Sequence, residues 1–245
     1  MQGIPARYTS VLLDEWDFSG DMMGGSLSLP VEMVEIPALQ MTALGKLPLM
    51  EGMGKLEFSG YYSGYDAGDI HAELQDRIDA ATLATVGVLL DTTTVGNPAF
   101  VLTSTWQDSF KINLPAKELI TLSGSFVANP VRSGYTIANQ TMTATPQAAV
   151  DMGAAGAAGC TAYLFVRAIT GSPSGITVKL QGSTTLGFGT PVDLGTWTSF
   201  TAVGCKILSV ASGTVHRYLR LSPTSLGGAT NFTACAVVCV PGVTE

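Results

Sequence analysis

Two pairs of closely spaced carboxylates are the residues best placed to do chemistry in this chain. They are Asp66 with Asp69 and Asp76 with Asp79. Two carboxyl groups at a suitable separation can act as acid and as base or nucleophile in glycoside hydrolysis. Acids of this kind are far more often solvated residues of turns and helices. We therefore assign them no catalytic role and predict that the protein is not an enzyme.

Other catalytic and ligand-binding motifs are missing from the sequence. The turn Gly171-Ser-Pro-Ser-Gly175 lacks the spacing and setting of a nucleophile elbow. No glycine-rich loop ends in Lys-Ser or Lys-Thr to hold phosphates. The only histidines are His71, for which we expect a surface position, and His216. Two histidines that lie far apart in the sequence do not indicate a histidine-based catalytic triad or metal site. We expect no cofactor and no bound metal.

The four cysteines, at positions 160, 205, 235 and 239, all lie late in the chain and include no Cys-x-x-Cys pair. Cys235 and Cys239 alternate with Val237, which places the three on one face of a strand and in an apolar core. Cysteine is among the residue types most often buried. The sequence therefore favours buried thiols over a metal site.

Charge is distributed unevenly along the chain. Residues 1–135 hold sixteen acids and seven bases, a net charge of −9, and residues 136–245 hold three acids and five bases, a net of +2, which together give −7. Such asymmetry indicates two domains in different surroundings. An acidic first half also argues against tight binding of nucleic acid, which needs Lys and Arg.

The composition favours strands over helices. Charged residues make up only 13% of the 245 residues, and Gly, Thr, Ser and Val are abundant. Mean hydropathy is +0.33, yet no run approaches the ~20 apolar residues of a membrane span. The first residues lack the features of a signal peptide. We expect the excess apolar surface to be covered by other protein subunits.

One strand organises the first half of the chain. Residues 52–62 alternate, with Leu56 and Phe58 on one face and Glu57 on the other. The string Leu56-Glu-Phe-Ser-Gly-Tyr-Tyr62 recurs as Ile120-Thr-Leu-Ser-Gly-Ser-Phe126, so two strands of one kind are expected.

The surrounding pattern predicts two domains. Asp69 is a candidate N-cap, and the apolar spacing after it predicts a helix that runs to about residue 81. Strands are expected around it, with a turn at residues 107–109. Residues 153–159, rich in Gly and Ala, are expected to form a mobile loop. We predict a mainly β, α+β chain: an N-terminal two-sheet domain with one flanking helix over residues 1–134, and a C-terminal β-sandwich of seven strands over residues 135–245.

Residues 36–53 form an apolar, Met-rich stretch, and Lys46 is its one charge between residues 36 and 50. It could be a lid over its own core or a docking loop that is buried only on assembly, since contiguous apolar surface usually marks a partner site. For the docking loop, the expected contact residues are Ile36, Leu39, Met41, Leu44, Leu47, Leu49, Met50 and Met53.

Residues 8–128 resemble the major tail tube proteins of long-tailed, siphovirus-like bacteriophages. Four strings carry the resemblance, namely Ser10-Val-Leu-Leu-Asp-Glu-Trp-Asp-Phe-Ser-Gly-Asp21, Gly54-Lys-Leu-Glu-Phe-Ser-Gly-Tyr-Tyr62, Gly96-Asn-Pro-Ala-Phe100 and Leu119-Ile-Thr-Leu-Ser-Gly-Ser-Phe126. Residues 136–245 look like the immunoglobulin-like or carbohydrate-binding-like sandwiches of phage virion proteins, with Val178-Lys-Leu-Gln-Gly-Ser183 and Arg217-Tyr-Leu-Arg-Leu221.

The resemblance implies a virion structural protein, assembled in the host cytoplasm into hexameric rings that stack into a tail tube. The implied partners are other copies of the chain, tape measure, tail terminator and distal tail proteins, and double-stranded DNA in transit without specific binding. The loop of residues 36–53 would reach neighbouring rings. Because they alternate with core residues, we expect Glu32, Glu35 and Glu57 to face an acidic lumen.

The alternative function is that of a phage adhesin or carbohydrate-binding module. The second domain would then carry the activity and bind a glycan. Self-association into rings supports the tube, and a glycan retained by residues 136–245 alone supports the adhesin.

Overall fold

A computed structural model describes residues 9–20, 22–29, 33–36, 45–48, 54–62, 70–80, 82–92, 94–115, 119–128, 130–153, 155–211, 213 and 215–241. The chain divides into two compact units. Unit 1 consists of Met1–Ser19, Gly87–Val101 and Arg132–Glu245, and unit 2 of Gly20–Val86 and Leu102–Val131. The predicted boundary between residues 134 and 135 stays a prediction.

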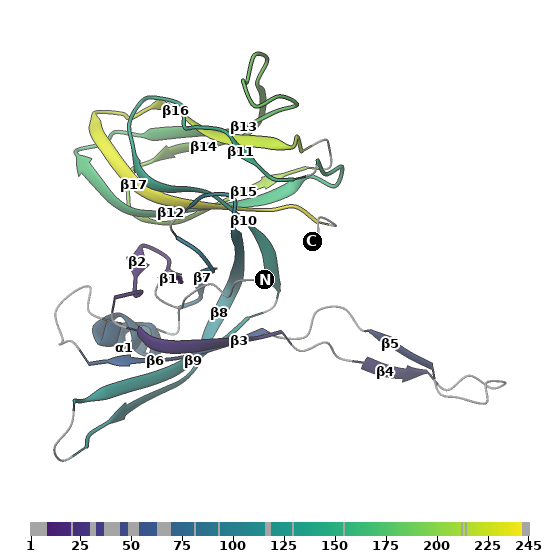
Figure 1. Cartoon of the computed structure of the whole chain (residues 1–245). Coiled ribbons are helices and arrows are strands. Elements are labelled where there is room, and N and C mark those ends of the chain that lie inside the picture. Colours follow the sequence, from purple (N-terminus) through teal and green to yellow (C-terminus); the bar gives the residue numbers. More distant parts are fainter. Residues whose placement is uncertain are drawn as a thin grey trace. The chain divides into compact units, whose positions relative to one another are not determined.

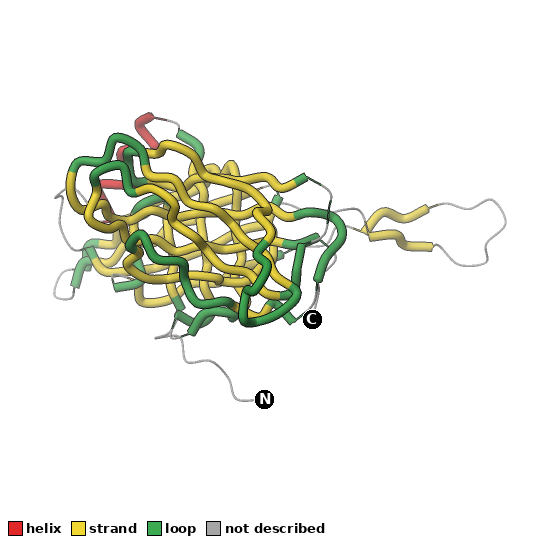
Figure 2. The backbone as a smooth tube through the Cα atoms, turned by 90° about the horizontal axis from the view of Figure 1, so that it is seen from above, coloured by secondary structure: helices red, strands yellow, loops and turns green. Residues whose placement is uncertain are grey.

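The predicted α+β class is wrong, because the described residues are almost all β. They form seventeen strands and one helix (Figure 2). A lone helix of 11 residues, α1 (Ile70–Ala80), is too little to form a helical layer. It is not long and apolar enough to cross a membrane, and no other helix occurs in the described ranges.

Unit 1 is built mainly from two antiparallel sheets that face each other. One contains β15, β12, β17 and β10, and the other contains β11, β16, β13 and β14 (Figure 1). The strands of this unit are β1 (Ser10–Leu13), β2 (Trp16–Asp17), β10 (Val131–Met142), β11 (Val150–Asp151), β12 (Cys160–Gly171), β13 (Ile176–Ser183), β14 (Val192–Phe200), β15 (Gly204–Val210), β16 (Tyr218–Ser225) and β17 (Ala229–Cys239).

The space between these two sheets is filled by one apolar core. Leu164 on β12 and Phe232 on β17 meet Val178 on β13 and Leu221 on β16, and all four are fully buried. Trp197 closes the core on β14, and its indole nitrogen donates to the Lys206 carbonyl at 3.1 Å. Residues 131–239 thus contribute eight described strands, where the sequence predicted seven.

The sheet that contains β12 and β17 is buried on its second face as well. A separate core packs there, formed by Leu12, Leu89, Ala99, Val101, Tyr163, Phe165, Cys235, Val237 and Cys239. None of these side chains is more than 4% exposed. Alternate residues of β12 therefore enter two different cores.

Cys235 and Cys239 are buried thiols, as the pattern around Val237 predicted. None of the four forms a disulfide, and Cys160, Cys235 and Cys239 are buried. Burial raises the pKa of Cys235 and of Cys239 to about 12 and that of Cys160 to about 11. These three groups are therefore protonated and unreactive at neutral pH.

An ion pair ties β2 to β12 within unit 1. Nη1 of Arg167 donates to Asp17 at 2.8 Å, and Nη2 donates to the Asn139 side chain at 2.7 Å. The β12–β17 register shifts between Val166 and Ala168. A bulge at this point re-aims the Arg167 side chain, and the sequence pattern did not reveal it.

Unit 2 contains the strand around which the first half of the chain was expected to be organised. Its elements are β3 (Met22–Ser28), β4 (Met33–Ile36), β5 (Gly45–Pro48), β6 (Gly54–Tyr61), α1 and β9 (Thr121–Ala128), and it shares β7 (Ala84–Leu89) and β8 (Pro98–Asn113) with unit 1. The stretch 107–109, expected to be a turn, instead lies inside β8 at a register shift against β9. A bulge lets one long strand continue where the polar residues suggested two short ones.

The helix of unit 2 corrects one prediction about its first turn. His71 is only 7% exposed, where a surface position was expected. Its ring meets Tyr62 edge-on at 4.9 Å and Phe110 at 5.4 Å between centroids. Leu74, about one turn later, is fully buried. His71 lies on this same face of α1, which packs inward, and is therefore buried as well.

Candidate functional site: a serine-lined sheet face

The two related strings of the sequence are neighbouring strands in unit 2. β6 pairs antiparallel with β9, Ser59 lies opposite Ser123, and each bulky residue beside a serine lies opposite a glycine: Phe58 opposite Gly124, and Leu122 opposite Gly60. β3 adds to the other edge of β6, and β8 to the other edge of β9. The result is the order β3–β6–β9–β8.

One face of this sheet is lined by small hydroxyl side chains. Directly opposite residues in an antiparallel ladder share a face, and the register places Ser26, Glu57, Ser125 and Ser109 in one row. The next row holds Gly24, Ser59, Ser123 and Lys111. We call this surface the serine face.

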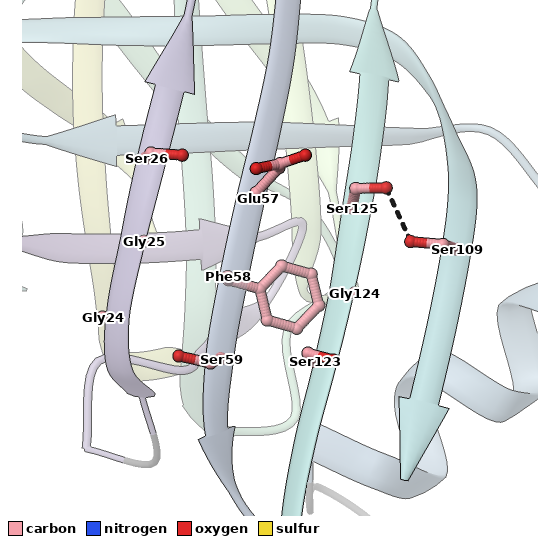
Figure 3. Close-up of a pocket in the computed structure, with 10 residues that line it drawn as sticks. All are labelled: Gly24, Gly25, Ser26, Glu57, Phe58, Ser59, Ser109, Ser123, Gly124 and Ser125. Carbon is pink, nitrogen blue, oxygen red and sulfur yellow. Dashed lines mark hydrogen bonds between the residues drawn. The ribbon is translucent and has the colours of Figure 1, made fainter. Parts of the chain in front are cut away.

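A shallow depression of about 390 Å³ lies on the serine face (Figure 3). Its lining comes from all four strands and consists of Gly24, Gly25, Ser26, Glu57, Phe58, Ser59, Ser109, Ser123, Gly124 and Ser125. The Ser109 and Ser125 hydroxyls are 2.8 Å apart, and Ser125 donates to Asp108 at 3.2 Å. Because the single hydroxyl hydrogen of Ser125 is donated to Asp108, the Ser109 hydroxyl must donate to Ser125.

The charges on this face cancel. Nζ of Lys55 lies 3.0 Å from Glu57 and 3.6 Å from Asp108. The hydrogen bond to Glu57 raises the pKa of Lys55. With Lys111 opposite Ser123, the described part of the face carries two bases and two acids. Its described residues present hydroxyl groups and balanced charges, without a free nucleophile–base pair.

The opposite face of the same strands is apolar and closely packed. Leu56, Phe58, Leu122 and Phe126 are at most 5% exposed, and the rings of Phe58 and Phe126 stack at 5.6 Å. Gly124 is required here, because a Cβ at this position would lie 2.7 Å from Cζ of Phe58 and 2.9 Å from the Ser109 carbonyl oxygen. Figure 3 shows the ring beside this glycine.

Replacing Gly124 by alanine is expected to lower the free energy of unfolding by about 1–3 kcal/mol, the usual cost of overpacking. Urea denaturation measures the change. Phe58→Leu should partly relieve it in the double variant, because the clash with the Ser109 carbonyl remains. Gly24→Ala is the matched control, since a Cβ there meets nothing within 4 Å. Equal stability of the Gly24 and Gly124 variants would contradict this packing.

The outer strand β3 is open on one side. Its only partner among the described strands is β6, and Met23, Gly24, Gly25 and Ser26 are exposed. The strand Met-Met-Gly-Gly-Ser-Leu-Ser contains no charge and no proline. Such an edge is a template for pairing with another strand.

The predicted inter-subunit residues fall mostly outside the described residues. Leu39, Met41, Leu44, Leu49, Met50 and Met53 all lie there. Ile36 ends β4, opposite Gly45, and Leu47 lies in β5, opposite Val34. β4 and β5 form a two-stranded sheet of their own, within a stretch for which the sequence predicted only a loop.

The three acids predicted to face a lumen lie in three different parts of the chain, and their position in a lumen stays a prediction. Glu57 lies on the serine face, as its alternation predicted, and is paired with Lys55. Glu35 lies in β4, opposite Lys46 in the register. Glu32 lies outside the described residues.

Catalytic chemistry finds no support in the described ranges. No cluster of three or more His, Cys, Asp or Glu residues among them could hold a metal ion. Asp66 and Asp69 lie outside these ranges, and Asp76 and Asp79 belong to α1. Sequence reasoning overlooked the serines, although the Ser-Gly pair shared by both related strings was the available signal.

Comparisons with known proteins give only distant similarities. No protein-family model and no curated protein matches the chain. Among solved structures, it is similar to a chain of the tube-terminating cap of the anti-feeding prophage, with 14% identity, coverage of 54% of this chain and 91% of that chain, and a TM-score of 0.43.

Two further structures are similar at the same level. One is the sheath/tube terminator of the extracellular contractile injection system PVC in its extended state, with 12% identity, coverage of 54% and 97%, and a TM-score of 0.45. The other is Hcp1 from Flavobacterium johnsoniae, with 13% identity, coverage of 51% and 94%, and a TM-score of 0.35. At TM-scores below 0.5, these similarities assign neither a family nor a function to this chain.

Proposed function

We propose that this chain is a virion structural protein, the major tail tube subunit of a siphovirus-like phage. It forms hexameric rings that stack into a tube, and double-stranded DNA passes through the lumen during ejection. The protein acts without a cofactor and is not an enzyme. It assembles in the host cytoplasm and resides in the phage tail.

The open edge of β3 is the observation that carries this proposal. Natural sheets protect exposed edges with charges, prolines or covering elements, and β3 has neither charge nor proline. A strand from a second copy would satisfy its outward backbone groups. Because the two edges of a sheet differ, such pairing is head-to-tail and closes into a ring when the rotation fits.

The serine face suits the inside of such a ring. Proteins grip DNA by neutralising phosphates with Lys and Arg, and Lys55 is already engaged by Glu57 and Asp108. Hydroxyl groups keep a hydrated surface that neither attracts nor strongly repels the duplex. In this proposal Glu57 faces the lumen, and Glu32 and Glu35 supply the further acids expected from the sequence.

The β4–β5 hairpin fits a role in contact between subunits. A two-stranded sheet alone is marginally stable in water, so this hairpin should gain stability by docking on another copy. The apolar residues of the loop 36–53 would provide that contact. Tape measure, terminator and distal tail proteins would bind the ends of the tube.

The two predicted domains have separate roles in this proposal. Residues 1–134 build the tube, and residues 135–245 decorate its outside. The adhesin alternative would place the function in residues 135–245.

Negative-stain microscopy and light scattering of the purified full chain test the proposal. Rings or tubes with six-fold symmetry are the expected result. A protein that stays monomeric at high concentration, over a range of salt concentrations, would overturn it.

A further inference from the structure

The outer face of the second sheet of unit 1 carries a row of polar side chains that fixes one arginine. Gln181 on β13 lies opposite Asp193 on β14 and opposite Arg220 on β16. The Gln181 amide donates to Asp193 at 2.7 Å, and Nε of Arg220 donates to the Gln181 carbonyl oxygen at 3.0 Å. Asp193 is held in turn by Lys179 at 2.5 Å.

An aromatic ring supports the same guanidinium. Cζ of Arg220 lies 4.3 Å from the centroid of the Phe188 ring, a distance at which the cation is attracted to the ring. Phe188 is buried and has a φ of 51°, in the left-handed region that favours glycine. Its loop is anchored where Ser183 accepts from the Thr185 amide at 3.1 Å.

The fork of Arg220 remains open. Within the described part of the chain, Nη1 and Nη2 of Arg220 have no hydrogen-bond partner, since Nε makes its only hydrogen bond. Arg217, the residue before β16, differs from Arg220 in this respect, because its Nε and Nη2 both donate to Asp151, at 2.7 and 2.6 Å. Because the charges of Lys179 and Asp193 cancel, the cluster around Arg220 has a net charge of +1.

We propose that Arg220 is an oxyanion-binding site, held in position by Gln181 and Phe188, which takes a carboxylate or phosphate group of a ligand lying on this sheet face. A planar guanidinium fork matches both groups in geometry and charge. Preorganisation lowers the ordering cost of binding.

This site goes beyond the tube proposal and does not depend on it. Saturation-transfer NMR on the ligand works equally for monomers and tubes. The probes are sodium glucuronate for a carboxylate, inorganic phosphate followed by its ³¹P linewidth, and methyl glucoside as the neutral comparison. Wild-type protein should bind at least one of the two anions and not the neutral sugar; which anion binds identifies the source of the oxyanion.

Two arginine variants form a matched pair. Arg220→Gln should weaken anion binding about tenfold or more, the loss expected for a charge-assisted bidentate contact. Arg217→Gln removes the same charge from an arginine that already makes a two-point contact with Asp151, and it should change the affinity less than about twofold. Arg220→Lys keeps the charge and the aliphatic stem but lacks the planar guanidinium group, so its anion affinity should lie within about threefold of that of Arg220→Gln. Arg220→Lys is also the test variant if Arg220→Gln does not fold.

Three outcomes would overturn the proposal. The first is that the wild type binds no anion. The second is an equal loss of anion affinity in Arg217→Gln and Arg220→Gln, which would indicate unspecific charge attraction, and the third is wild-type anion affinity in Arg220→Lys. Microscopy of Arg220→Gln separates this site from the tube proposal, because rings should form as in the wild type.

Discussion

A chain with lysines in place of Gly24 and Ser26 is expected to remain a folded monomer and to lose ring and tube formation. Both residues lie on the exposed edge strand β3. Lysines on an edge are a common natural protection against strand addition, so the variant changes an open edge into a blocked one. Light scattering and negative-stain microscopy should show a rise of about tenfold or more in the concentration needed for assembly.

The subunit itself should tolerate these lysines. A Cβ at Gly24 meets nothing within 4 Å, and Ser26 lies opposite Glu57, where a lysine forms a cross-strand pair that contributes about 0.2–1 kcal/mol. Thermal unfolding should therefore change little. Lysines at Ser59 and Thr121 are the matched control, because they add the same charge to the two central strands.

Two results would count against edge pairing. The first is normal assembly of the Gly24 and Ser26 variant. The second is an equal loss of assembly in the Ser59 and Thr121 control, which would attribute the effect to charge on the face.

The isolated fragment 135–245 is expected to aggregate or to bind hydrophobic dyes. Removing residues 1–134 uncovers Tyr163, Phe165 and Val237, which pack against Leu12 and Leu89 in the full chain. Burying a large apolar side chain contributes roughly 1.5–3 kcal/mol, so the loss is comparable with the whole stability of a domain, about 5–15 kcal/mol. Dye fluorescence and size-exclusion chromatography measure the result.

Polar substitutions distinguish the two faces of the exposed sheet. Phe165→Thr with Val237→Thr should restore a soluble fragment, because threonine favours strands and these residues no longer face a core. Leu164→Thr with Val238→Thr should not, since both residues belong to the core between the two sheets. A monomeric wild-type fragment with a cooperative melt would refute the expectation and support the boundary at residue 134.

Several local features were predictable because they depend on near neighbours. Alternation placed Leu56 and Phe58 in the core and Glu57 on the surface, as observed. The apolar spacing after Asp69 predicted the helix, which spans Ile70–Ala80. The face shared by Cys235, Val237 and Cys239 is buried as expected.

Features that depend on distant contacts were not predictable. Polar residues at 107–109 suggested a turn, but pairing with β9 keeps them within β8 as a bulge. In the segment 153–159, rich in Gly and Ala, Gly156 exchanges backbone hydrogen bonds with Val215 at 2.9 and 2.8 Å, a contact that the local composition does not reveal. His71 was expected at the surface and packs between Tyr62 and Phe110.

The amino-acid order alone determined the strand-rich character of this protein, the repeat of the Ser-Gly strings and the apolar faces, because side-chain alternation and turn residues act over a few positions. Only the tertiary structure decided that the two strings pair with Ser59 opposite Ser123, that β12 and β17 are covered on both faces, and that Arg220 keeps an open fork. Each of these depends on contacts between residues far apart in the chain, and no local pattern encodes which distant strand becomes the neighbour.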